Sequence, residues 1–217
     1  MDPTAYTPEM VLDFWFPDTG HETSVETHGA WIDERMRGGM DAAIIERFGD
    51  LTLAGARGLL DHWAETPRGR LALVIVLDQF PRSLWRDTPM AYGQDIKAAR
   101  LSLEAIETGE ADTLPPWESF FYSVSVYHCE GPQHLKRLED LVAFNERLIA
   151  LYPEALSDFT EGFRRQTAWG REIIRAYGRH PHRNAILGRT STPEEEVYIA
   201  KGEFPHTSKP DAEDAED

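Results

Sequence analysis

The chain has 217 residues, of which 41% are hydrophobic and 11% aromatic, a composition that predicts a folded globular protein rather than a disordered one. Its 22 basic and 38 acidic side chains give a formal net charge of −16, which argues against nucleic acids and anionic membrane surfaces as partners. The single cysteine, Cys129, cannot form an intramolecular disulfide, and the chain shows neither a signal-peptide pattern nor a long apolar run, so we expect a cytoplasmic protein.

Proline, glycine and N-capping residues divide the chain into predicted helices, and no pair of strands with a hairpin signal occurs. Thr66-Pro67 and Thr88-Pro89 predict helix starts, whereas Gly49 and Pro81 predict helix ends. The expected helices are 8–16, 24–37, 40–48, 51–64 (as one helix or two short ones), 67–80, 89–108, 116–127, 132–152, 154–177 (with Gly162 as a weak point) and 193–201.

The stretch 67–80 is the expected centre of the fold. Its middle, residues 71–77, is apolar without interruption, so a helix here has no polar face and is predicted to be buried on all sides. The β-branched residues at 74–76 would also suit a buried strand, but Pro67 at a helix start and a length of roughly 14 residues favour a helix. The sequence therefore predicts an all-α domain over residues 1–202, an antiparallel helical bundle or array, and an acidic, disordered tail at 203–217.

Four polar runs interrupt the apolar helices and supply the candidate site residues. The last run is a positive island in an acidic chain, and guanidinium groups bind carboxylates or phosphates through two N–H groups at once. The same arginines could instead pair with Asp78, Asp95, Glu130 or Glu194 and hold their loop on the bundle. The runs comprise Asp78, Gln79, Arg82 and Trp85; then Asp95; then His128, Cys129, Glu130, Gln133 and His134; and finally Arg179, His182, Arg183, Asn184 and Arg189.

His128 and Glu130 are the candidate catalytic residues, because a carboxylate next to an imidazole raises the basicity of the ring. A metal site built on the same run would lack the paired cysteines or histidines of structural zinc sites, so we predict no metal. No glycine-rich phosphate loop and no Gly-x-Ser-x-Gly nucleophile motif occurs, so no cofactor is predicted either. Five tryptophans, at positions 15, 31, 63, 117 and 169, fit core helix positions, whereas Trp85 lies where it could line a cleft.

The chain resembles a bacterial family catalogued as domain of unknown function 924. The resemblance implies a tetratricopeptide-like, all-α fold and implies no established activity. This chain has Cys129 and Gly131 where the family pattern leads us to expect serine and aspartate. The matching motifs are Phe14-Trp-Phe16, Leu71-Ala-Leu73 with Leu77-Asp-Gln-Phe-Pro-Arg82, Tyr127-His-Cys-Glu130 with Gln133, Tyr177-Gly-Arg-His-Pro-His-Arg-Asn-Ala-Ile-Leu-Gly-Arg189 and Ser191-Thr-Pro-Glu-Glu195.

These patterns support three hypotheses about function. In the first, a helical binding protein holds a small anionic ligand or a peptide end in a polar cleft floored by Asp78 and Arg82 and walled by His128, Arg183 and Asn184. In the second, an enzyme of undetermined class uses His128 as acid or base and Glu130 to orient it, with an arginine that holds an anion. In the third, a scaffold, the polar runs lie scattered over the surface. The sequence does not indicate an oligomeric state.

Overall fold

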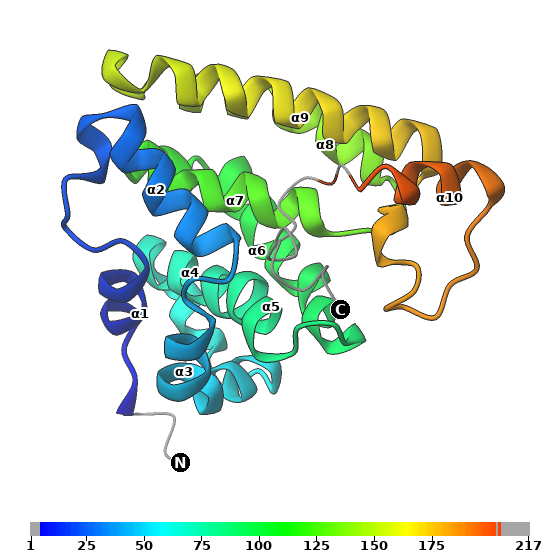
Figure 1. The fold of residues 1–217 in the computed structure, drawn as a ribbon. Coiled ribbons are helices and arrows are strands. Elements are labelled where there is room, and N and C mark those ends of the chain that lie inside the picture. The colour runs from blue at the N-terminus through cyan, green and yellow to red at the C-terminus, as the bar shows by residue number, and fades with distance from the viewer. Residues whose placement is uncertain (1–4, 203, 205–217) are drawn as a thin grey trace, which may run out of the picture.

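The computed structural model describes residues 5–202 and residue 204, and over these residues it contains helices and turns but no β-strand. The α-helices are α1 (Pro8–Trp15), α2 (Val25–Met36), α3 (Asp41–Ala56), α4 (Pro67–Val74), α5 (Phe80–Leu84), α6 (Asp95–Glu107), α7 (Pro116–His128), α8 (His134–Ile149), α9 (Ser157–Tyr177) and α10 (Pro193–Ala200). The predicted all-α fold is therefore confirmed. Consecutive helices pack on one another, α6 on α7, α7 on α8 and α8 on α9, and α9 forms one outer face of the molecule (Figure 1).

The predicted division into a domain and a tail stays a prediction. The acidic segment 203–217 lies outside the described residues, apart from Phe204. The tetratricopeptide-like arrangement likewise remains what the resemblance implies. Within the described ranges, none of the helices combines the length and apolarity needed to cross a lipid bilayer.

The central helix is buried as predicted, but it does not end at Pro81. Residues 71–77 are all at most 1% exposed. α4 then passes into a π-helical turn, Ile75–Gln79, in which the Phe80 N–H donates to the carbonyl of Ile75, five residues back. In a regular α-helix the ring of Pro81 would collide with the carbonyl four residues earlier. The wider turn in front of the proline reduces this conflict, so the chain continues into α5 instead of stopping.

Two other predicted boundaries are wrong, at Gly49 and Thr88, whereas Gly162 was predicted only as a weak point of one helix. α3 runs on through Gly49, because the buried side chains on both sides of it pack into the core and outweigh the low helix propensity of glycine. Thr88 opens only a short 3₁₀ turn, since its hydroxyl donates to the carbonyl of Trp85, and α6 begins at Asp95. α9 is continuous through Gly162. The predicted capping box before α10 is present, with Thr192 and Glu195 bonded to each other's backbone N–H groups.

The core is one cluster of buried side chains drawn from α1 through α9. Trp15, Trp31 and Trp63 belong to it, as predicted, and Trp117 packs against it. The prediction for Trp169 is wrong, because this side chain is 38% exposed. α9 lies on the outside of the bundle (Figure 1), so part of its aromatic face is left uncovered.

Two glycines of α9 are predicted to respond in opposite ways to the same substitution. A Cβ atom at Gly170 would lie 2.1 Å from the ring of Tyr127, whereas at Gly162 its nearest neighbour would be the mobile guanidinium of Arg165 at 3.8 Å. Gly170→Ala should therefore lower the free energy of unfolding by about 1–3 kcal/mol through overpacking. Gly162→Ala should raise it by about 0.5–1 kcal/mol, because alanine is the better helix former. Urea denaturation of both variants measures these changes. Equal changes in the free energy of unfolding for Gly170→Ala and Gly162→Ala would contradict the prediction.

Candidate functional site

Residues from all four predicted polar runs meet in one place. We define the polar cluster as Asp78, Arg82, Asp95, His128 and Arg183. Asp78 lies in the π turn and Arg82 one turn later in α5, Asp95 begins α6, His128 ends α7, and Arg183 lies in the loop between α9 and α10. Asp78 follows the buried apolar stretch 71–77, and His128 ends a helix in which residues 120–126 are buried, so the core fixes where these two side chains lie. The convergence argues against the scattered arrangement that a scaffold predicted.

Asp78 is the innermost member of the polar cluster and is fully buried. Its two carboxylate oxygens each lie 3.0 Å from Nδ1 of His128, and Arg82 Nη1 lies 3.1 Å from Oδ1. The side-chain amide of Gln79 also donates to this carboxylate. Burial raises the pKa of Asp78, although Arg82, Gln79 and Arg183 act in the opposite direction. The contacts to cationic and amide donors are what make a carboxylate tolerable at this depth.

Asp95 links the two arginines of the cluster. Its Oδ2 accepts a hydrogen bond from Arg82 Nη2 at 3.0 Å and lies 3.5 Å from Arg183 Nη1. Its other oxygen, Oδ1, is buried and has no hydrogen-bond partner among the described residues. Burial raises the pKa of Asp95 to about 6, with Arg82 opposing the shift and Asp78 adding to it. One carboxylate oxygen is thus shared by two guanidinium groups while the second is unused.

Tyr92 supports both guanidinium groups. The central carbon of Arg183 lies 4.5 Å from the centroid of its ring, and that of Arg82 lies 5.7 Å away. Arg183 also donates from Nη1 to the carbonyl of His128 at 2.8 Å, whereas its Nε is buried without a partner in the described structure. The Arg183 side chain is buried, but that of Arg82 is 20% exposed and forms the side of the cluster that solvent can reach. Tyr92 was not among the predicted site residues. Its place one turn before Asp95 was the signal in the sequence that could have identified it.

The rest of the arginine-rich loop is held by ion pairs of its own. Glu130 accepts from Arg189 and, at 2.6 Å, from the backbone N–H of His180. Arg189 Nε donates to Asn184 Oδ1 at 3.0 Å. Despite burial, the bond from Arg189 and the nearby Arg183 hold the pKa of Glu130 below its usual value. These contacts show that Arg189 and Asn184 fix the loop to the bundle.

Glu195 holds the loop at its other end. Arg179 donates to it through Nε and Nη2, both at 2.7 Å, and Asn184 Nδ2 donates at 3.1 Å. The hydrogen bonds from Arg179 lower the pKa of Glu195 to about 2. The acidic partner in α10 is therefore Glu195 and not the predicted Glu194. Glu195, the last residue of the capping box, thus contacts the loop as well as the start of its own helix.

The predicted pairing of His128 with Glu130 is wrong. α7 ends at His128, and the extended backbone of Cys129 directs Glu130 toward the loop, where Arg189 and His180 bind it. The carboxylate that contacts His128 is that of Asp78, 50 residues earlier in the chain. If His128 acts as an acid or base, Asp78 is the group that orients its ring.

The remaining candidates lie around the polar cluster. Gln133 is exposed and adopts φ of +60° just before α8, and Trp85 is half-buried after α5. His182 is half-buried, with its ring 5.5 Å from that of His180. His180 and His134 both donate from Nε2 to the carbonyl of Tyr127, at 3.2 and 3.0 Å, and so satisfy the end of α7. Among the described residues, no three histidine, cysteine, aspartate or glutamate side chains are grouped so that they could hold a metal ion.

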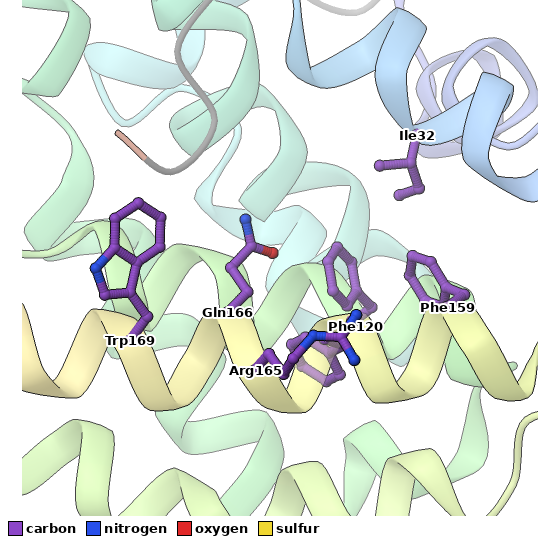
Figure 2. Close-up of a pocket in the computed structure, with 8 residues that line it drawn as sticks. Ile32, Phe120, Phe159, Arg165, Gln166 and Trp169 are labelled. Carbon is purple, nitrogen blue, oxygen red and sulfur yellow. The ribbon is translucent and has the colours of Figure 1, made fainter. Parts of the chain in front are cut away.

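A cavity of about 500 Å³ lies away from the polar cluster, between α2, α7 and α9 (Figure 2). Its lining is mainly aromatic and includes none of the candidate site residues. This cavity was not predicted from the sequence, and the predicted cleft at the polar runs stays a prediction. The cavity forms where the aromatic face of α9 stands off from α2 and α7, a separation that no local sequence pattern reveals.

Comparison with known proteins places the chain in a family. A solved structure of a protein of unknown function from Agrobacterium tumefaciens is similar to it, with 30% sequence identity, a TM-score of 0.68, and coverage of 93% of this chain and 100% of that one. No curated protein matches the sequence significantly. The model of a family described as bacterial protein of unknown function, DUF924, matches residues 11–203. The chain therefore belongs to the DUF924 family, as its motifs indicated.

Proposed function

We propose that this protein is a cytoplasmic binding protein whose polar cluster holds a small molecule with a carboxylate next to a hydrogen-bond donor, such as an amino acid or a hydroxy acid. The observation that supports this most directly is a pair of unused buried atoms of opposite kinds. Asp95 Oδ1 is an acceptor without a donor, and Arg183 Nε is a donor without an acceptor, in the described structure. Unsatisfied groups of this kind are rare in folded proteins and costly.

The charge distribution of the cluster favours an added anion. Arg82 and Arg183 share one oxygen of Asp95, while Asp78 is already in contact with His128 and an amide as well as Arg82. A ligand carboxylate would give the two guanidinium groups a second acceptor, in the fork geometry that arginine provides. The hydrogen-bond donor next to the ligand's carboxylate would donate to Asp95 Oδ1. The exposed edge of Arg82 supplies the approach from solvent.

The test is a titration that isolates the guanidinium fork. Differential scanning fluorimetry against a panel of amino and hydroxy acids should identify ligands that raise Tm, and calorimetry should give their Kd. Arg82→Lys keeps the charge and loses the fork, so we expect about tenfold weaker binding. The unliganded Tm should also fall, because the lysine loses one of the two contacts that Arg82 makes with Asp78 and Asp95. Arg86→Lys is the matched control, because Arg86 is an exposed arginine that pairs with Asp41. Equal affinities of both variants, or no binding by any member of the panel, would contradict the proposal.

A second candidate function rests on the contact between Asp78 and His128. A buried carboxylate at 3.0 Å from Nδ1 fixes the ring orientation and its tautomer, as in general acid–base catalysis. An enzyme of this kind would convert a ligand that the titration above identifies. Loss of turnover in His128→Gln with retained ligand binding would favour catalysis, whereas binding without turnover in the unaltered protein favours the binding function alone.

A further inference from the structure

The cavity between α2, α7 and α9 has the size and composition of a small-molecule site. Its volume of about 500 Å³ lies within the range of roughly 300–1,000 Å³ that is typical of ligand pockets. Seen from the side in Figure 2, aromatic side chains from α9 and α7 face Ile32 of α2 across the opening. The lining consists of Ile32, Phe120, Phe159, Gly162, Phe163, Arg165, Gln166 and Trp169.

The lining combines an apolar interior with a cation at its edge. Phe120, Phe159 and Phe163 provide the apolar wall, and Trp169 adds a large ring that is 38% exposed at the end of the pocket. Arg165 is the charged member of the lining, and its side chain is 71% exposed. The nearest carboxylate, that of Glu161, is 3.8 Å away, which is a loose contact that a ligand anion can replace.

Gly162 gives an independent indication that the pocket is kept open. It lies inside α9, where glycine costs about 0.5–1 kcal/mol relative to alanine. Close packing does not require it, because an added Cβ would touch only the end of the Arg165 side chain at 3.8 Å. Gly170 of the same helix differs, since the ring of Tyr127 occupies its surroundings. A side chain at position 162 would occupy pocket volume, so the glycine preserves space that the core does not need.

We propose that this pocket binds a small amphiphilic acid, an acyl chain or aromatic ring that ends in a carboxylate. The apolar part would lie among Phe120, Phe159 and Phe163, and the carboxylate would pair with Arg165 at the rim. A smaller cavity of about 20 Å³ shares Phe120, Phe163 and Gln166 with the pocket, so the apolar space extends under α9. The site is separate from the polar cluster, and either proposal can fail without the other.

Calorimetric titration of the full chain with octanoate, and with 1-octanol as the uncharged counterpart, tests this proposal. We expect octanoate to bind at one site and 1-octanol to bind more weakly. Arg165→Gln should weaken octanoate binding by about two- to fivefold, as for an exposed ion pair, and should leave 1-octanol binding unchanged. Lys136→Gln is the charge-matched control, because Lys136 is an exposed cation of α8 that pairs with Asp140.

A substitution that fills the pocket provides a second test of the proposal. Gly162→Leu should weaken both ligands by about tenfold or more, while Ala143→Leu, at an exposed position of α8, should change neither. Thermal melts of the two leucine variants show whether each remains folded. Equal binding of octanoate to the Arg165→Gln variant and to the original protein would overturn the pairing with Arg165. Unchanged affinities in a folded Gly162→Leu variant, or no octanoate binding at all, would overturn the site.

Discussion

Arg183→Met should lower the free energy of unfolding by about 3–5 kcal/mol. The methionine fills much of the same volume, but it removes the cation that faces Asp95 at 3.5 Å and the hydrogen bond to the carbonyl of His128. Asp95 then stays buried with only Arg82 beside it. The cost arises mainly from the carboxylate and carbonyl left behind, because unpaired buried polar groups lose their hydration without compensation.

Two further variants separate this cause from a general loss of packing. Arg175→Met removes an exposed arginine whose partners are Glu139 and Glu172, so it should change stability by at most about 1 kcal/mol. The double variant Arg183→Met with Asp95→Leu removes both charges of the buried pair and should recover a large part of the loss. Urea denaturation at pH 7.5 measures all three. A double variant less stable than Arg183→Met alone would contradict the electrostatic explanation.

Acidification from pH 7 to 5.5 should lower the free energy of unfolding by about 4 kcal/mol. Burial lowers the pKa of His28, His134 and His182 to about 4, and it lowers the pKa of His180 well below the ordinary value of 6.5. Below pH 6.5 the unfolded chain therefore binds protons at these imidazoles while the folded protein does not, so stability falls as the pH falls. Asp95 acts in the opposite direction, because its raised pKa of about 6 lets the folded state bind a proton first.

Chemical denaturation at the two pH values measures this dependence. His28→Phe should reduce the loss by about 1 kcal/mol, since one fully buried imidazole no longer contributes. Asp95→Asn should increase the loss by a similar or smaller amount, because it removes the opposing proton uptake. A free energy of unfolding that is the same at pH 7 and 5.5 would show that these imidazoles are protonated in the folded state.

Local sequence signals predicted the parts of the fold that depend on neighbours along the chain. The capping box of Thr192 and Glu195 spans four residues and was found where expected. The π turn before Pro81 was not predicted, because it depends on how the buried helix fits its surroundings. Gly49 was read as a helix end from its propensity, whereas tertiary packing carries α3 through it.

The candidate site shows the same division between local and distant effects. The sequence indicated which polar runs would meet, because they interrupt apolar helices that pack into one core. It did not indicate which atoms pair. Glu130 was assigned to His128 because the two are adjacent in sequence, but the structure pairs His128 with Asp78 and Glu130 with Arg189, 59 residues away. Partner choice among several carboxylates and cations is a property of three-dimensional distance.

The π turn changes the register of the central helix. A turn of this kind contains one residue more than an α-helical turn, so side chains on its two sides are rotated relative to each other by about 100°. Asp78 and Arg82 are four residues apart and lie on one face of the helix, and the offset sets how that face is turned relative to the buried side chains of α4. Deletion of one residue from the turn would restore regular α-helical spacing and rotate α5 by about 100° relative to α4. The additional residue therefore lies where the buried helix α4 passes into the segment that carries the polar groups.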